Sequence, residues 1–232
     1  MYLLTETASP FALERWAAFF ANFGQFAKGF FYTLGISIGA LIVALLLGLI
    51  FGAMSSTHNK VLRGISRVYV EIFQNTPLLV QFVVVFYGIS ILTDGHVMIP
   101  ISLTAILCVG VYTGAYISEI IRTGIEAVPK GQTEAALSQG FTYADTMRII
   151  ILPQAVRTIL PPLTNQVVNL IKNTSTVAII SGADIMFTAK AWAYDTTNYV
   201  PAFAGAALLY FIMCFPLATW ARRKEEENKK AY

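Results

Sequence analysis

The run from Gly29 to Met54 constrains this chain more than any other feature, because it contains no charged residue. A helix needs about 20 consecutive apolar residues to cross the hydrocarbon core of a bilayer. Inside that core every backbone polar group must be paired within the segment, as it is in a helix. The run therefore predicts a membrane-spanning helix. Two small-residue pairs, Gly35 with Gly39 and Gly48 with Gly52, also predict faces that a second helix approaches closely.

Composition and the remaining apolar runs extend this prediction to the whole chain. Of 232 residues, 56% are hydrophobic and 12% are charged, whereas soluble domains carry about 25% charged residues. We expect one all-α, integral membrane domain over residues 1–232. Five transmembrane helices are predicted, at about residues 29–54, 68–92, 99–121, 149–180 and 200–221. Pro153, Pro161 and Pro162 predict that the fourth span is not one regular helix.

The N-terminal segment mixes apolar and charged residues and so differs from the spans. Residues 11–23 combine aromatic side chains with Glu14 and Arg15, which predicts a short amphipathic helix at the membrane surface. The alternative is a simple extension of the first span. Glu6 and the lack of a basic stretch argue against a cleaved signal peptide. A further short helix is predicted over residues 182–195.

Basic residues predict the orientation, because Lys and Arg concentrate in the cytoplasmic loops of membrane proteins. They cluster after the first span, after the third span and in the tail, at Lys60, Arg63, Arg67, Arg122, Lys130, Arg148, Arg222, Arg223, Lys224, Lys229 and Lys230. The opposite loops hold few, and residues 93–96 hold none. We expect a multi-pass protein with its N-terminus outside and its C-terminus in the cytoplasm.

A polar insert, EAALSQGFTYADTMRIIILPQA, occupies residues 134–155 on the predicted cytoplasmic side. Pro129 ends the third span, and residues 132–139 then predict a short helix. Glu134 is expected in the first turn of that helix, where a negative charge suits the helix dipole.

A sharp turn and a second helix are predicted after it. Gly140 suits the left-handed position that often ends a helix. Thr142 and Asp145 have the spacing of a capping box that opens a second short helix. A helix, a turn and a helix on a polar face form a surface suited to docking. The alternative is a simple re-entry turn at the bilayer surface.

The insert and its flanks resemble the EAA loop of ABC importer permeases. Glu134, Ala135 and Ala136 are followed by Gly140, Ile150, Leu152 and Pro153 at the spacing of that loop. The segments EIFQNTPLLVQF (71–82), EIIRTGIEAVPKGQTEAA (119–136) and NLIKNTST (169–176) resemble the polar amino-acid group of these permeases, for histidine, glutamine or glutamate and aspartate. The resemblance covers about residues 28–221.

This resemblance implies a type I permease fold whose coupling loop, residues 126–148, seats on a separate ABC ATPase subunit. The coupling residues that it implies are Glu134, Ala135, Ala136, Leu137, Gly140 and Phe141. It also implies a second permease subunit, the same or related, and an extracytoplasmic substrate-binding protein, in the bacterial cytoplasmic (inner) membrane. The chain has no G-x-x-x-x-G-K-[ST] phosphate loop. We therefore expect no enzyme activity and no cofactor in it, with ATP and magnesium on the partner ATPase.

Polar side chains inside predicted spans are costly and mark candidate substrate-pathway residues. The candidates are Gln74, Asn75, Thr76, Gln81, Tyr112, Tyr116, Asn165, Gln166, Asn169, Lys172 and Asn173. Asn165, Asn169 and Asn173 step by four and share one helix face. Lys172 lies close to that face, where its ammonium can receive an α-carboxylate. For each single residue, hydrogen bonding between helices is the alternative role.

Two further local predictions concern structure. Pro77 is expected to free the carbonyl of Phe73 and distort the second span. Glu119 and Arg122 are three residues apart and are expected to form a local ion pair.

The function predicted from these features is import of a polar amino acid, with glutamate, aspartate or glutamine favoured. The alternative is an ATPase-independent channel or secondary carrier for a small polar solute, which would show inverted repeats or an intramembrane proton relay. No metal site is expected, because Cys108, Cys214, His58 and His96 lie apart in the sequence. Nucleic-acid binding is not expected either, because the sequence has no stripe of basic residues for a phosphate backbone.

Overall fold

The computed structural model describes residues 9–230, which fold into helices with no strand among the described residues. The expectation on a signal peptide concerns residues that lie mostly outside this range. The elements in order are α1 (Leu13–Ala21), α2 (Phe23–Ser55), α3 (Lys60–Gln74), α4 (Leu78–Val83), the π-helix η1 (Val84–Gly88), α5 (Ile89–Leu92), α6 (Ile101–Glu126), α7 (Lys130–Ser138), α8 (Tyr143–Asp145), the π-helix η2 (Thr146–Ile151), α9 (Leu152–Asn173), the 3-10 helix η3 (Thr174–Ile180), α10 (Ile185–Thr196) and α11 (Tyr199–Lys230).

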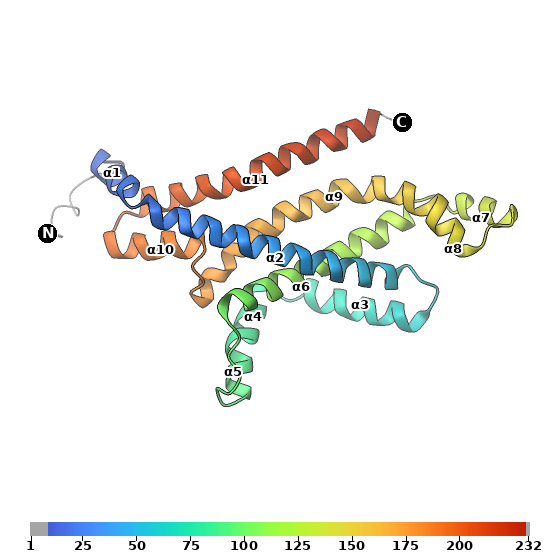
Figure 1. Ribbon diagram of the computed structural model, residues 1–232, viewed down its shortest axis with the longest axis horizontal. Coiled ribbons are helices and arrows are strands. Elements are labelled where there is room, and N and C mark those ends of the chain that lie inside the picture. The colour runs from blue at the N-terminus through green and yellow to red at the C-terminus, as the bar shows by residue number, and fades with distance from the viewer. Residues whose placement is uncertain (1–8, 231–232) are drawn as a thin grey trace.

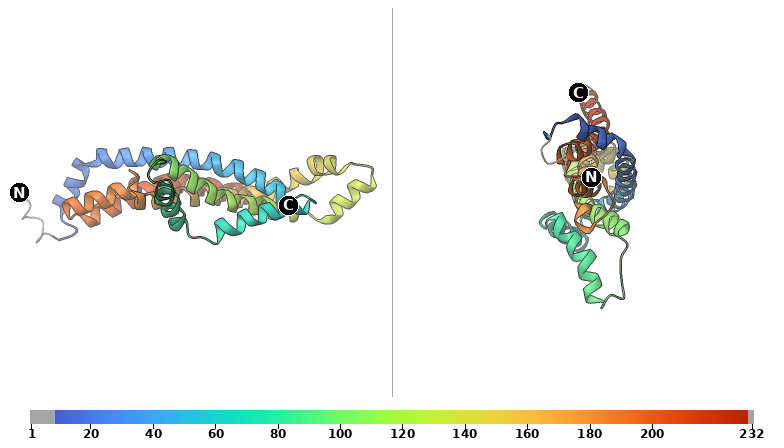
Figure 2. Two further views of the ribbon diagram at one scale, coloured as in Figure 1. Left: turned by 90° about the horizontal axis from the view of Figure 1, so that it is seen from below. Right: turned by 90° about the vertical axis from the view of Figure 1, so that its left-hand side faces the viewer.

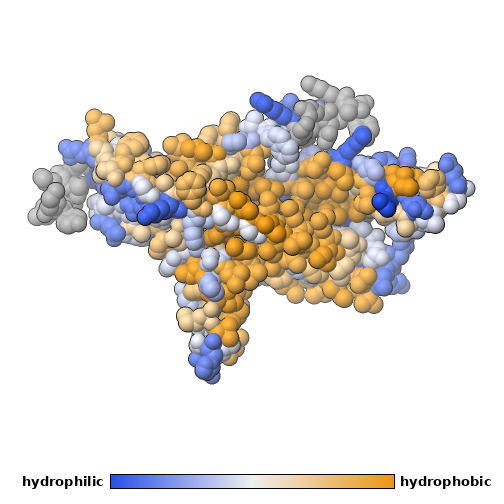
Figure 3. All heavy atoms as spheres, viewed as in Figure 1, coloured by the Kyte–Doolittle hydropathy of each residue, from blue (hydrophilic) through white to orange (hydrophobic). Residues whose placement is uncertain are grey.

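The molecule is elongated, with α2, α6, α9 and α11 running along its length (Figure 1). α1 and α10 lie at one end, and α7 and α8 project from the other. η1 and α5 form the outer part of an arm that projects from the helix bundle, as the right-hand view of Figure 2 shows. α4, at the base of this arm, packs against α6 and η3. Apolar residues cover the middle of the face seen in Figure 3, and hydrophilic residues gather near both ends and at the tip of the arm. This pattern suits a body that crosses a bilayer.

Within residues 9–230, three helices are long and apolar enough to cross a membrane: α2, α6 and the Tyr199–Arg223 part of α11. A fourth span is obtained if α3 and the segment Leu78–Leu92 count as one broken span, although the two meet at 97°. The all-α membrane architecture is thus confirmed, whereas the number of five spans stays a prediction.

The bend after α3 follows from Pro77. Its ring nitrogen has no hydrogen to donate, so the helix ends at Gln74 and restarts at Leu78. The carbonyl of Phe73 is freed as predicted, and Nε2 of Gln81 donates to it at 3.2 Å. The same nitrogen donates to the carbonyl of Thr76 at 3.0 Å. The break is therefore sharper than the predicted distortion, and one buried amide satisfies both exposed carbonyls.

The fourth predicted span is irregular, but for a different reason than expected. It passes from π-helix η2 through α9 into 3-10 helix η3, and so is not one regular helix. Pro153 lies in the first turn of α9, where its missing N–H costs nothing. Pro161 and Pro162 lie inside α9 without ending it. The changes of helix type occur at the two ends rather than at this proline pair.

Close packing of α2 against α6 holds the centre of the bundle. A Cβ on Gly48 would lie 2.4 Å from Cγ2 of Ile117, and one on Gly52 would lie 2.8 Å from Cβ of Ile121. A Cβ on Gly39 would lie 2.9 Å from Cδ1 of Ile106. The prediction of close helix approach is confirmed at these three glycines and is wrong at Gly35, which faces open space.

The N-terminal segment forms a separate helix, α1, because the chain turns at Asn22 before α2 begins. The prediction of a separate short helix is thus confirmed, and the alternative, an extension of the first span, is wrong. Arg15 anchors it by donating to Oδ1 of Asn198 at 2.9 Å and to the carbonyl of Thr197 at 3.0 Å. Phe19 is buried in an aromatic and alanine-rich cluster with Trp192. The predicted helix over 182–195 is also present, as α10.

Candidate functional site

The projecting end of the molecule is built by α7 and the turn that follows it. Pro129 precedes α7, which runs from Lys130 to Ser138. Because the helix starts two residues earlier than predicted, Glu134 lies in its second turn, and the prediction that places it in the first turn is wrong. Glu134 and Leu137 are exposed, the latter at 47%.

The two alanines of the EAA sequence have opposite environments. Ala135 is exposed, whereas Ala136 is buried at 3%. α7 packs against η2, so Ala136 holds the loop to the bundle, and Ala135 belongs to the outer face. The two alanines therefore do not share one face of α7.

Gly140 ends α7 in the left-handed conformation, with φ at +88°, as predicted. The N–H of Gly140 donates to the carbonyl of Leu137 at 3.0 Å, and the N–H of Phe141 donates to the carbonyl of Ala136 at 3.2 Å. These two bonds are those of a Schellman motif. No atom lies within 4 Å of a Cβ built on Gly140, so its conformation, and not space, favours glycine here.

The predicted second helix begins at Thr142, as expected. Its hydroxyl oxygen accepts from the N–H of Asp145 at 3.2 Å, and the hydroxyl donates to the Asp145 carboxylate at 2.5 Å. The helix is not a separate short element, because α8 continues through η2 into α9. The projecting end of the molecule is thereby joined to α9 by continuous helical backbone.

A contact that the sequence did not reveal joins this loop to the connection between α2 and α3. The ring of His58 meets the ring of Tyr143 edge to face, with centroids 5.1 Å apart. Nothing in the spacing of these residues signals the pair, since they are far apart in the chain.

Several candidate pathway residues on α3 and α4 bond to the protein itself. Nε2 of Gln74 donates to the carbonyl of Ala115 on α6 at 3.2 Å. Nδ2 of Asn75 donates to the Glu71 carboxylate at 3.0 Å, and the hydroxyl of Thr76 donates to the carbonyl of Ile72 at 2.8 Å. Gln74, which bonds α3 to α6, and Gln81, which bonds α4 back to α3, therefore have the partners between helices that the alternative role requires. The bonds of Asn75 and Thr76 stay within the end of α3.

Polar residues on α6 form one column. The hydroxyls of Tyr112 and Tyr116 are 3.1 Å apart. Further along, Nε of Arg122 donates to the Glu119 carboxylate at 3.0 Å, which confirms the predicted ion pair. Arg122 also binds Glu126 at 2.5 Å, a partner that was not predicted. The guanidinium is therefore shared between two carboxylates.

The α9 candidates lie at the surface of the single chain. Asn165, Asn169 and Lys172 are exposed, and Gln166 and Asn173 are half-buried. Oε1 of Gln166 accepts from Nδ2 of Asn169 at 3.4 Å. Lys172 lines a hollow of about 310 Å³ together with Tyr210 of α11 and Met186 of α10.

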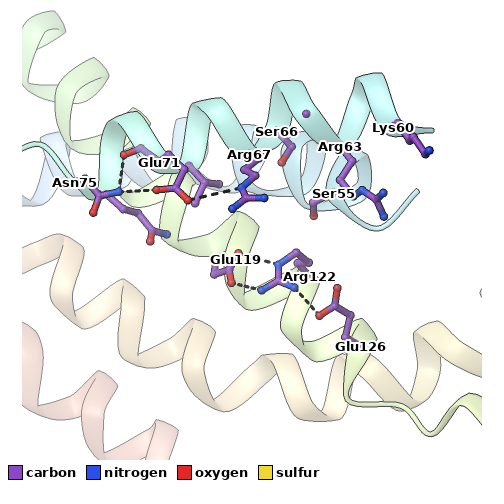
Figure 4. A pocket seen from close by; sticks show the side chains of 13 residues that line it. Ser55, Lys60, Arg63, Ser66, Arg67, Glu71, Asn75, Glu119, Arg122 and Glu126 are labelled. Carbon is purple, nitrogen blue, oxygen red and sulfur yellow. Dashed lines mark hydrogen bonds and ion pairs between the residues drawn. The ribbon is translucent and has the colours of Figure 1, made fainter. Parts of the chain in front are cut away.

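The structure brings the α3 and α6 residues together at a larger cavity. It has a volume of about 660 Å³ and is lined by Gln74, Asn75 and Glu71 from α3 and by Glu119 and Arg122 from α6 (Figure 4). Tyr112, Tyr116 and the α9 candidates do not line it. No group of metal-ligating residues occurs among the residues described.

Sequence reasoning also missed Asp184, which lies between η3 and α10 outside the predicted spans. It is fully buried and caps α10 by accepting from the N–H of Phe187 at 3.0 Å and that of Met186 at 3.2 Å. The Tyr210 hydroxyl donates to the same carboxylate at 3.1 Å. Burial raises the pKa of Asp184 to about 6, although these hydrogen bonds oppose the shift.

Comparison with known proteins agrees with this architecture. Residues 44–225 match the family described as binding-protein-dependent transport system inner membrane component. A probable glutamine ABC transporter permease protein GlnM of Bacillus subtilis is 37% identical over 216 residues, which cover 92% of this chain and 97% of that protein. The glutamate/aspartate import permease protein GltJ of Escherichia coli K12 is 35% identical over 187 residues, covering 73% and 76%.

Solved structures share the fold. A chain from the crystal structure of an amino acid ABC transporter with histidines superposes with a TM-score of 0.84 at 31% identity, covering 91% of this chain and 98% of that one. An inward-facing MetNI methionine ABC transporter chain superposes with a TM-score of 0.69 at 16% identity, and this likeness concerns the fold alone. Because the family match extends over most of the chain and GlnM aligns over nearly its whole length, the protein belongs to the inner membrane components of binding-protein-dependent transport systems, the permease subunits of ABC importers.

Proposed function

We propose that this permease imports a polar amino acid, with glutamate, aspartate or glutamine as the favoured solutes. The likeness to permeases named for glutamine and for glutamate and aspartate supports this solute class. The observation that carries the proposal is the projecting α7 turn, which presents the EAA sequence at one end of the bundle. A channel or carrier that works without a separate ATPase needs no such docking surface.

The exposed face of α7 is proposed to dock on a separate ABC ATPase subunit, which would bind ATP and magnesium. Leu137 and Phe141 supply apolar contacts, and both are at least one-third exposed. Glu134 and Ala135 complete this outer face, while Ala136 and Gly140 keep its shape. Because α8, η2 and α9 are continuous, a displacement of the ATPase would be carried along the backbone into the bundle.

A second permease subunit, the same or related, is proposed to complete the solute path. The exposed amides of α9 support this, because polar side chains at membrane depth need a protein or aqueous partner. The arm exposes Val84 at 60% and Ile91 at 73%, surfaces suited to lipid or to a second subunit. An extracytoplasmic substrate-binding protein would dock at the end that carries α1 and α10. In this proposed arrangement, the N-terminus would lie outside and the C-terminus in the cytoplasm, as the basic residues predict.

Transport is proposed to proceed by alternating access. Closure of two ATPases on ATP would draw two coupling loops together and open the outer side, and hydrolysis would return the inward-facing state. Within the path, the Lys172 ammonium would receive the α-carboxylate of the solute, beside Asn165, Asn169 and Asn173. The bonds made by Gln74 and Gln81 favour a structural role for these two residues.

The alternative is an ATPase-independent channel or secondary carrier. Uptake into proteoliposomes separates the two functions, with the complex purified from native membranes and labelled glutamate, aspartate, glutamine and leucine as test solutes. We expect uptake of one of the three polar amino acids only with substrate-binding protein outside and ATP on the coupling-loop side. Equal uptake without ATP would support the carrier instead.

The ATPase partner is tested by co-purification of the tagged protein in mild detergent. An ATPase with a phosphate loop is expected with wild type and is expected to be lost with Gly140→Pro, which cannot adopt φ of +88°. Gly131→Ala is the control, because Gly131 lies in α7 and also faces open space. Failure of wild type to retain any ATPase would contradict the coupling proposal.

A further inference from the structure

The cavity between α3 and α6 separates two polar columns (Figure 4). Both helices extend toward the end that carries α7 and α8 (Figure 1). One column comprises Lys60, Arg63, Arg67 and Glu71 on α3, and the other comprises Glu119, Arg122 and Glu126 on α6. Gln74 lies near the inner end of the first column, close to the Pro77 break, and Lys60 lies at the outer end. A volume of about 660 Å³ falls within the range of about 300–1,000 Å³ that is usual for small-molecule sites.

The charges along this cavity are not evenly matched. Arg122 is held between Glu119 and Glu126. Nε of Arg67 lies 3.8 Å from Oε1 of Glu71. Lys60 and Arg63 take part in none of the ion pairs formed by the described side chains. The unmatched positive charge therefore lies at the outer end of the cavity.

The other face of α3 explains why the cations line the cavity. Val61, Ile65 and Val68 form an apolar stripe on α3, and each is about half exposed or more. None of the three lines the cavity. An amphipathic helix with its apolar stripe turned outward directs its charged residues to the opposite side, where α6 faces them.

We propose that this cavity is an exit site, in which Lys60 and Arg63 bind the carboxylate of an amino acid that has left the transport path. The inference rests on the proposed function, because it takes the coupling-loop end as the cytoplasmic side. Glu126, the α6 carboxylate toward the outer end of the same cavity, supplies an acceptor for the ammonium group. An acidic amino acid, with two carboxylates, binds there more tightly than its neutral amide.

Both cations are exposed, so the site binds weakly. Weak binding suits release, because a site on a transport path must let its solute leave. A high concentration of the acidic amino acid on this side fills the site and slows further import. The proposal thus predicts inhibition by product, with a preference for glutamate over glutamine.

The test uses the whole complex in proteoliposomes with ATP inside and the coupling loop facing the lumen. Uptake of whichever labelled solute is transported is measured against increasing unlabelled glutamate or glutamine in the lumen. In wild type, we expect lumenal glutamate to inhibit at lower concentration than glutamine. In the double variant Lys60→Gln with Arg63→Gln, the half-inhibiting glutamate concentration should rise about fivefold or more, as expected for loss of a charge-assisted contact.

The matched control is the double variant Arg222→Gln with Arg223→Gln, which removes the same charge from the exposed end of α11. In this control, lumenal glutamate should inhibit uptake at the same concentration as in wild type. Equal half-inhibiting concentrations in the wild type and in the Lys60 and Arg63 variant would overturn the proposal, as would equal potency of glutamate and glutamine. A difference found only in vesicles of anionic lipid would assign the cations to a lipid headgroup and reject the amino acid. Absence of any ATP-driven uptake by wild type would instead refute the proposed function, and this exit site with it.

Discussion

At the end of the bundle that carries α1 and α10, aromatic and polar side chains are buried, whereas at the end that carries α7 and α8 most side chains face solvent. Phe19, Trp192 and Asp184 fix the first end through contacts between residues far apart in the chain. The second end is shaped by local bonds around Gly140 and Thr142. The surface proposed to dock on an ATPase is thus shaped by local bonds, and the opposite end is held by contacts between distant segments. The predictions below test this difference.

The largest effect is expected at Phe19. Its ring centroid lies 4.8 Å from that of Phe26 and 5.9 Å from that of Trp192, and it packs against Gly205. Phe19→Ala should lower the free energy of unfolding by about 3–5 kcal/mol, because it leaves a cavity in a packed cluster. Denaturant unfolding of the purified protein measures this. Phe20→Ala is the control, since Phe20 is exposed, and an equal loss there would show that α1 is not anchored as described.

The second effect is a pH dependence of stability at Asp184. Its folded-state pKa of about 6 lies above the ordinary value of 3.8, so folding favours the protonated form. Stability from this group is present below about pH 4 and is lost as pH rises to about 6, by up to about 3 kcal/mol. Thermal unfolding between pH 4 and 8 should therefore show lower stability at the higher pH. Asp184→Asn should flatten the profile, while Asp145→Asn, at an exposed position, should leave it unchanged.

The third effect concerns Gly140 and should appear in transport rather than in stability. Any residue with a Cβ is strained at φ of +88°, by about 1–2 kcal/mol. Gly140→Ala should lower ATP-driven uptake about tenfold, because the docking turn is distorted while the bundle stays intact. Gly131→Ala makes the same chemical change at helical φ and should have little effect. Similar uptake by both variants would contradict the role given to this turn.

The smallest effect is expected at the ring contact of His58 with Tyr143. Edge-to-face aromatic pairs contribute about 0.5–1.5 kcal/mol, so His58→Ala should reduce the coupled ATPase rate a few-fold. His58→Phe keeps a ring at that position and should restore most of the rate. In a double-mutant cycle with Tyr143→Ala, the effects should be less than additive. Full additivity would mean that the two rings do not act together.

Much of the fold follows from the sequence because its signals are local. The uncharged run of α2 and the turn at Gly140 each depend on residues close together in the chain. The ion pair of Glu119 with Arg122 is likewise set by helical spacing. Small residues in a span permit close packing, so the sequence predicts that another helix approaches Gly48. It does not predict that the residue in contact is Ile117.

The remaining features depend on contacts between distant segments. Pro77 predicts a distortion, yet the 97° bend depends on how α4 packs. The opposite environments of Ala135 and Ala136 depend on η2 lying against α7. Asp184 gives no signal of its burial, since an acid outside the spans usually faces water. The cavity between α3 and α6 could not be foreseen, because its two sides are separated by the arm.

The most direct measurement of the central claim is chemical crosslinking from adjacent positions of α7. In a background with Cys108→Ala and Cys214→Ala, single cysteines replace Ala135, Ala136 and Leu137 in the assembled complex. A thiol-to-amine crosslinker is then added, and the captured protein is identified by mass spectrometry. Capture of a phosphate-loop ATPase is predicted from positions 135 and 137, and not from the buried position 136. Failure to capture it from 135 and 137, or equal capture from a cysteine at Tyr194 on the opposite end, would contradict the account.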